Sequence, residues 1–177
     1  MPTLSVRPDK IPQGSYYADS YNERWSLRHL FHRRRLDTLA RLVPTPARVL
    51  DAGCGSGVLC RLLADKGCMV AGVDLRQDRV VWCKQFIPEG EFSLGDLRTC
   101  KLGAQFDVVI ASEVLEHVSA IDRQVALVNL SSHMKNGGRL IVTVPSSLYL
   151  RFEPVWELIR GWQYGVEGHD DELRHDL

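Results

Sequence analysis

Acidic residues follow the apolar runs in the central part of the chain. They are Asp51, Asp74, Asp96 and Glu113, and the glycine-rich turn GCGSG (residues 53–57) comes directly after the first of them. Closely spaced glycines let a backbone bend sharply or approach a ligand, and carboxylates attract cations and accept hydrogen bonds. The pattern predicts a binding site for a ligand that carries an amine or another cation near the turn.

The glycine spacing argues against a dinucleotide ligand. A dinucleotide turn reads GxGxxG, whereas the third glycine of this chain comes one residue earlier. Asp51 also stands two residues before Gly53, where its charge would repel a pyrophosphate. The turn therefore favours a different kind of nucleotide-like ligand.

Short apolar runs alternate with segments of helical periodicity. The runs cover residues 48–53, 69–74, 91–96, 106–113 and 138–145, and the helical segments cover 57–66, 76–86 and 120–135. Strands that alternate with helices predict an α/β fold, a doubly wound parallel sheet with helices on both faces. Ligands of such sheets bind outside the carboxyl ends of the strands, which is where the acids and the glycine turn fall.

The flanking segments suggest one domain with a short arm. Residues 1–15 carry three prolines and a glycine and are expected to be a flexible arm. Residues 16–43 show helical periodicity until Pro44 and Pro46 stop it. We expect a single domain over 16–177, with N-terminal helices at 16–43, a ligand-binding core at 47–145 and a helical C-terminal segment at 146–177.

Composition excludes several classes of protein. The chain has 22 basic and 22 acidic residues, which gives no footprint for a nucleic acid or an anionic membrane. No apolar run approaches the roughly 20 residues of a membrane span, and the N-terminus lacks the apolar core of a signal peptide. The five cysteines form no CxxC pair, so we expect reduced, mostly buried thiols and a cytoplasmic location.

Five motifs in order carry a resemblance to a known family. They are VLDAGCGSG (49–57), VAGVD (70–74), SLGDL (93–97), FDVVIASEVLEHV (106–118) and KNGGRLIVTVP (135–145). Together they resemble the successive motifs of class I S-adenosylmethionine-dependent methyltransferases, closest to the ubiquinone-biosynthesis-like group (methyltransferase type 11–12). The resemblance implies a Rossmann-like sheet with strand order 3-2-1-4-5, S-adenosyl-L-methionine as cofactor, and methyl transfer to a small-molecule acceptor, at a hydroxyl oxygen.

The same resemblance implies a set of cofactor-binding residues. By position in the motifs they are Asp51, Ala52, Gly53, Cys54, Gly55, Gly57, Asp74, Leu75, Asp96, Leu97, Ser112 and Glu113. The glycines match those that let the backbone approach the methionine and ribose part of the cofactor. Ser112 and Glu113 follow the fourth run, where the family closes over the methionine arm.

Individual roles follow from the motif positions. Asp51 matches the acid near the cofactor's amino group, and Asp74 matches the acid that accepts both ribose hydroxyls. Asp96 and Leu97 match the pair that faces the adenine. In related enzymes an arginine of the N-terminal segment lies near the cofactor's carboxylate, and Arg34 is the candidate for that position.

The EVLEHV segment allows three interpretations. His117 is a candidate general base for a hydroxyl acceptor, since histidine titrates near neutral pH. Alternatively it starts a helix and packs or hydrogen-bonds without chemistry. In the third interpretation Glu113, Glu116 and His117 resemble the ExxEH metal motif of RNA 3′-terminal 2′-O-methyltransferases, with a later histidine, His169 or His175, as fourth ligand.

The C-terminal end departs from the family pattern. The family sheet continues past its fifth strand through a helix and a β-hairpin, but the residues after VTVP contain no second strand pair. The hairpin is therefore expected to be missing, and a further alternative is a fragment that binds the cofactor without turnover. The aromatic and apolar residues at 148–164 either pack on the sheet or line an acceptor pocket.

Overall fold

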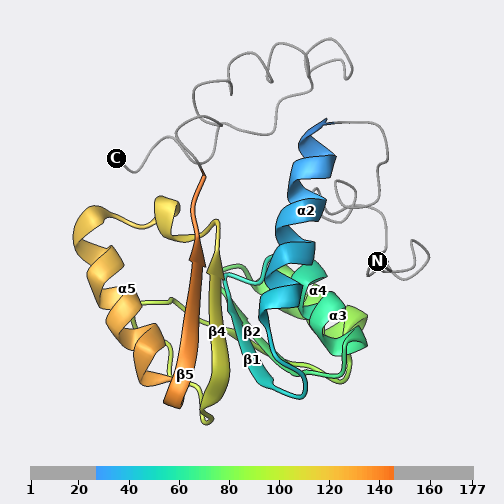
Figure 1. Cartoon of the computed structure of the whole chain (residues 1–177). Coiled ribbons are helices and arrows are strands. Elements are labelled where there is room, and N and C mark those ends of the chain that lie inside the picture. The colour runs from blue at the N-terminus through green and yellow to red at the C-terminus, as the bar shows by residue number, and fades with distance from the viewer. Residues whose placement is uncertain (1–26, 146–177) are drawn as a thin grey trace. The chain divides into compact units, whose positions relative to one another are not determined.

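The computed structural model describes residues 27–145, and the described residues up to Val144 belong to one compact unit (Figure 1). The expected arm at 1–15, the N-terminal part of the predicted 16–43 helices, the segment 146–177, and His169 and His175 lie outside the described residues. Helix α2 (Leu27–Leu42) falls within the segment predicted to be helical.

A parallel sheet forms the centre of the described part of the chain. Its five strands are β1 (Arg48–Ala52), β2 (Met69–Asp74), β3 (Glu91–Leu94), β4 (Phe106–Ser112) and β5 (Met134–Thr143). They pair in the order β3-β2-β1-β4-β5, and every pairing is parallel. The predicted order 3-2-1-4-5 is therefore confirmed.

Helices cover both faces of this sheet (Figure 1). Helix α2 lies on one face with α3 (Val58–Asp65) and α4 (Gln77–Phe86), and α5 (Ala120–Ser132) lies on the other. A short 3-10 helix, η2 (Leu115–His117), follows β4. Within the described residues, none of the helices has the length and apolar character that crossing a membrane requires.

The central strands are buried on both sides. Val49 of β1 and Val108 of β4 belong to the core under α2, α3 and α4. Their neighbours Leu50 and Val109 belong to the core under α5. Because successive side chains of a strand point to opposite faces, a strand buried on both faces reads as a continuous apolar run, as the sequence of β4 does.

The junction between α5 and β5 differs from the prediction. Helix 120–135 was expected, but α5 ends at Ser132, and β5 starts at Met134 rather than at residue 138. The strand contains an irregular register opposite Phe106 and Val108, and Gly137 adopts a φ of 78°. A glycine in the left-handed region accommodates a β-bulge, so the strand continues through Gly137.

Gly57 begins α3 in a conformation and a space that favour glycine. Its φ is 73°, and a Cβ built there would lie 2.9 Å from Cys83 Sγ and 3.2 Å from Ile87 Cδ1 of the segment after β2. Cys83 of α4 and Ile87, directly after α4, therefore pack against the backbone of Gly57 at the start of α3.

Gly57→Ala should lower the free energy of unfolding by about 2 to 4 kcal/mol, from the left-handed backbone and the overpacking together. Urea denaturation followed by circular dichroism measures the change. Gly103→Ala is the matched control, since a Cβ at Gly103 meets no atom within 4 Å in the described part of the chain. Equal stability of the two variants would contradict this account of the loop.

Candidate functional site

The turn between β1 and α3 is held to β2 by its backbone. Gly53 N donates to Val73 O at 2.8 Å, and Gly55 N donates to Asp74 Oδ2 at 2.8 Å. A Cβ at Gly53 would lie 2.6 Å from Val114 Cγ2, whereas a Cβ at Gly55 would meet no described atom within 4 Å. Of the three motif glycines, Gly55 is thus the one that leaves open space beside the backbone, and the other two serve internal packing.

Asp74 ends β2 beside this turn. Its Oδ2 accepts from Gly55 N and its Oδ1 accepts from Arg76 N at 2.9 Å. Each carboxylate oxygen has two acceptor positions, so Asp74 retains capacity for two further donors. The half-buried side chain therefore both shapes the turn and can accept two hydrogen bonds from a ligand.

Asp51 lies under the turn and is almost completely buried, with 4% of its surface exposed. Cys60 Sγ donates to Asp51 Oδ2 at 3.5 Å. Burial raises the pKa of Asp51 from its ordinary 3.8 to about 7, and the neighbouring Asp74 charge adds to the rise. The Cys60 hydrogen bond and the Arg35 charge oppose it. Asp51 therefore changes charge near neutral pH.

Three cysteines pack beneath the turn. Cys83 Sγ donates to the carbonyl of Gly55 at 3.3 Å. A hydrogen bond with Cys83 and burial raise the pKa of the Cys54 thiol, and burial raises that of Cys60. All five cysteines of the chain are buried and unpaired, which confirms the prediction of buried thiols. Ala52 is also fully buried in the core.

A second polar cluster lies at the ends of β4 and β5. Glu113 Oε2 pairs with Arg35 Nη1 of α2 at 3.1 Å, and Glu113 Oε1 accepts from Thr143 Oγ1 at 3.0 Å. Ser112 Oγ lies 2.9 Å from Thr143 Oγ1 and completes a chain of hydrogen bonds. Glu113 has a φ of 53°, a left-handed conformation that is uncommon for a residue with a side chain and often marks a functional site.

The sequence predicts Ser112 and Glu113 as cofactor-binding residues but predicts neither Arg35 nor Thr143. The structure brings Arg35 to this edge, whereas Arg34, the arginine suggested by the sequence, is exposed. The Nε of Arg35 is buried and has no hydrogen-bond partner among the described residues. The run of consecutive arginines in the sequence was the available signal, although it did not say which of them faces the sheet.

The two residues predicted to face the adenine, Asp96 and Leu97, lie in different surroundings. Leu97 is 5% exposed and packs in the core under α5. Leu75, another predicted cofactor-binding residue, is 68% exposed after β2. Both carboxylate oxygens of Asp96 accept hydrogen bonds from Arg98. Asp96 is therefore already engaged by the protein itself.

The EVLEHV segment (113–118) follows β4 and contains η2. His117 is exposed, and its backbone N donates to Val114 O at 3.2 Å. Glu116 Oε2 is buried and has no partner within the described range. No group of three His, Cys, Asp or Glu side chains in residues 27–145 is placed to hold a metal ion, so Glu113, Glu116 and His117 are not assembled as a metal site there.

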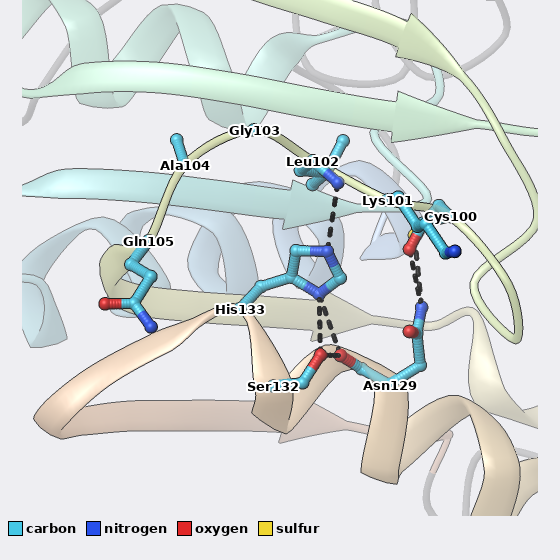
Figure 2. A pocket seen from close by; sticks show the side chains of 9 residues that line it. All are labelled: Cys100, Lys101, Leu102, Gly103, Ala104, Gln105, Asn129, Ser132 and His133. Atoms are coloured by element: carbon cyan, nitrogen blue, oxygen red, sulfur yellow. Dashed lines mark hydrogen bonds between the residues drawn. The ribbon is translucent and has the colours of Figure 1, made fainter.

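A hollow of about 480 Å³ lies at the opposite edge of the sheet, where β4 and β5 begin (Figure 2). It is lined by the loop 100–105 and by the end of α5. Figure 2 shows the His133 ring between these two segments: Nδ1 donates to Asn129 O at 2.8 Å and Nε2 accepts from Leu102 N at 3.1 Å. Both ring nitrogens are satisfied, so His133 joins the loop to the helix. The hollow contains none of the predicted site residues.

Comparison with known proteins places this geometry in a family. A family model described as "Methyltransferase domain" matches residues 24–175. The chain belongs to the class I S-adenosylmethionine-dependent methyltransferases. The methyltransferase fold accounts for the strand order and for the placement of the glycine turn and the acids at the carboxyl edge.

Two relatives of this methyltransferase domain have the same name. The domain is 30% identical over 142 residues to the ubiquinone biosynthesis O-methyltransferase of Coxiella burnetii (strain Dugway 5J108-111), and the aligned part covers 77% of this chain and 58% of the relative. The domain is 35% identical over 85 residues to the ubiquinone biosynthesis O-methyltransferase of Bartonella quintana (strain Toulouse), and the aligned part covers 45% of this chain and 34% of the relative. The chain therefore spans between a third and three fifths of these relatives' lengths.

Solved structures agree with this family. A TehB-like SAM-dependent methyltransferase from Corynebacterium glutamicum is 28% identical with a TM-score of 0.58, covering 71% of this chain and 70% of that one. The PH0226 protein from Pyrococcus horikoshii OT3 has a TM-score of 0.67 at 24% identity, covering 78% and 64%, and shares the fold. These comparisons give no support to the RNA methyltransferase alternative.

Asp51 of the methyltransferase domain should make stability depend on pH. An acid whose pKa is raised by folding contributes stability that is present below its unfolded pKa and lost as pH rises through the folded value, between about 4 and 7 here. Asp51→Asn keeps an oxygen that accepts from Cys60 but cannot ionise. The variant should therefore exceed the natural chain in stability at pH 8 by roughly 2 to 4 kcal/mol, and the difference should shrink toward pH 4.

Urea denaturation at a series of pH values measures this difference. Asp78→Asn is a suitable control, because Asp78 is exposed and its pairing with Arg76 lowers its pKa. A constant difference between Asp51→Asn and the natural chain from pH 4 to pH 8 would show that Asp51 does not titrate in this window.

Proposed function

We propose that this methyltransferase domain binds S-adenosyl-L-methionine along the carboxyl edge of β1, β2 and β4 and transfers the methyl group to a small-molecule acceptor, at a hydroxyl oxygen. The observation that carries the proposal is the corner formed by the open backbone at Gly55 and the Asp74 carboxylate. The names of the two ubiquinone-biosynthesis relatives support a hydroxyl acceptor.

The chemistry of the cofactor fits the groups at this edge. Its ribose carries two neighbouring hydroxyls, and Asp74 has two acceptor positions left for them. Its amino-acid end carries a carboxylate, for which the Nε of Arg35 is a buried donor without a partner among the described residues. Its ammonium group would be matched by Asp51 or Glu113, on both of which the charge of Arg35 acts.

The cofactor, when bound, supplies a methyl group that is already activated by a positive sulfur. The chain's task is then to hold the acceptor in line with that methyl and to keep water away. Arg35, Glu113, Thr143 and Ser112 form one connected polar network that can fix the position of the amino-acid end. An unprotonated ring nitrogen of exposed His117 is our candidate to take the proton of the acceptor hydroxyl.

Two further parts of the proposal concern the setting of this activity. We propose a cytoplasmic location, because five unpaired buried cysteines suit a reducing compartment. Binding of the cofactor without turnover is the alternative. Transfer of an isotope-labelled methyl group from the cofactor to a phenolic acceptor by this chain separates turnover from binding alone.

Calorimetric titration with S-adenosylhomocysteine, the demethylated cofactor, tests the site. We expect binding to the natural chain and a loss of at least about 30-fold in Asp74→Ala, because two hydrogen bonds to a charged group are removed. Asp78→Ala is the matched control, since Asp78 is an exposed acid four residues further on that pairs with Arg76. It should bind like the natural chain.

The outcomes separate the parts of this proposal. No binding to the natural chain would overturn the proposed function. Equal binding by natural chain and Asp74→Ala would remove Asp74 from its role. Asp74→Asn, which retains one oxygen acceptor, keeps the test valid if Asp74→Ala loses its helical signal in circular dichroism.

Arg35→Met should weaken S-adenosylhomocysteine binding about tenfold, because a charge-assisted contact with the ligand carboxylate is lost. 5′-Methylthioadenosine has no carboxylate and should bind the natural chain and the variant equally. Arg34→Met, at the exposed neighbour, should change neither affinity. An equal loss for both ligands in Arg35→Met would show that Arg35 supports the fold through Glu113 and does not contact the ligand.

A further inference from the structure

The carboxylate of Asp96 accepts several hydrogen bonds from the neighbouring Arg98. Its Oδ1 accepts from Arg98 N at 2.8 Å and from Arg98 Nε at 3.0 Å. Its Oδ2 accepts from Arg98 Nε at 2.9 Å and from Arg98 Nη2 at 2.5 Å. Three N–H groups of Arg98 therefore reach this carboxylate, and the Nε–H is shared between its two oxygens.

Arg98 is also anchored to a second acid. Its Nη1 donates to Asp122 Oδ2 at 3.0 Å, in the first turn of α5. Asp122 is held by the N-cap Ser119, whose Oγ donates to Asp122 Oδ2 at 3.0 Å and accepts from Asp122 N at 3.2 Å. The guanidinium therefore bridges the segment after β3 and the start of α5, and it can release one acid while it remains bound to the other.

Because Arg98 and Asp96 are both partly exposed, breaking their ion pair costs little free energy. The side chain of Arg98 is 43% exposed and that of Asp96 is 25% exposed. Exposed ion pairs contribute little to stability because water replaces the lost contacts. The Arg98 hydrogen bonds lower the pKa of Asp96, so its carboxylate is charged while Arg98 holds it.

We propose that Arg98 competes with the ligand's adenine for the Asp96 carboxylate and thereby sets how strongly this domain discriminates for an exocyclic amine. The inference rests on the proposed function, and in particular on Asp96 facing the adenine. The backbone N–H and the guanidinium of Arg98 together approach both oxygens of Asp96. An amine N–H that reaches Asp96 therefore competes with Arg98 for the same two oxygens.

Calorimetry with two ligands measures this competition. The first ligand is S-adenosylhomocysteine, which lacks the sulfonium charge, so its affinity is not raised simply by removing the positive charge of Arg98. The second is its 6-desamino analogue, with purine in place of adenine. Arg98→Ala should bind S-adenosylhomocysteine about two- to fivefold more tightly than the natural chain, while its affinity for the analogue should not change.

Two sets of variants act as controls. In an Asp96→Asn background, Arg98→Ala should have no further effect, because the competing carboxylate is gone. Arg48→Ala is the matched surface variant, since Arg48 Nη2 donates to both carboxylate oxygens of Glu91 at the opposite, amino ends of β1 and β3. It should leave both affinities unchanged. Arg98→Lys keeps the positive charge but not the planar guanidinium. Its affinity for S-adenosylhomocysteine should lie between those of the natural chain and Arg98→Ala.

Each outcome has one consequence. Tighter binding of S-adenosylhomocysteine alone supports the competition. Unchanged or weaker binding, or an equal gain for both ligands, overturns it while the proposed function stands. Absence of S-adenosylhomocysteine binding to every protein, the natural chain included, overturns the proposed function and this inference together.

Discussion

The hydrogen bond from the Gly55 backbone to Asp74 ties the ends of β1 and β2 together, and the candidate site is arranged around it. It requires the turn after β1 to bend back over β2, which places Gly53, Gly55 and Gly57 in the left-handed region. The same bend leaves open space beside Gly55 and packs Gly57 against Cys83. A ligand surface and the start of α3 therefore depend on one short segment.

The two buried faces of the sheet explain why polar groups gather at its edge. Val49 and Leu50 enter opposite cores, so the interior of β1 offers no place for a solvated side chain. Asp51 is the exception, and its raised pKa reflects the cost of keeping a carboxylate there. Asp74 and Glu113, at the ends of their strands, have hydrogen-bond or ion-pair partners instead.

The negative charges at this edge are partly neutralised by arginines, one of which lies far from its acids in the sequence. Arg35 of α2 pairs with Glu113 after β4 and also acts on Asp51 in β1. The helix that precedes the sheet therefore completes an edge formed by its strands. Arg98 likewise donates hydrogen bonds to Asp96, two residues earlier in the chain, and to Asp122 in the first turn of α5. Both arginines link the carboxyl edge to the helices around it.

The amino-acid sequence by itself determined most of the strands and helices, because those depend on local signals, while the strand order followed from the resemblance to a family. Apolar runs of strand length, the glycine turn and one acid after each of the first four runs are all readable within a few residues. The family motifs then related these pieces to one another. The start of β5 was missed, since few of its first residues are apolar and they pair with β4 through an irregular register opposite Phe106 and Val108.

Only the tertiary structure decided which side chains meet. Each residue turns a helix by about 100°, so Arg34 and Arg35 point in different directions. The packing of Leu36 and Leu39 on the sheet determines that Arg35 faces Glu113. Thr143 joins Glu113 and Ser112 because β5 pairs with β4 in a particular register. Such choices depend on contacts between residues far apart in the chain, which local sequence patterns do not encode.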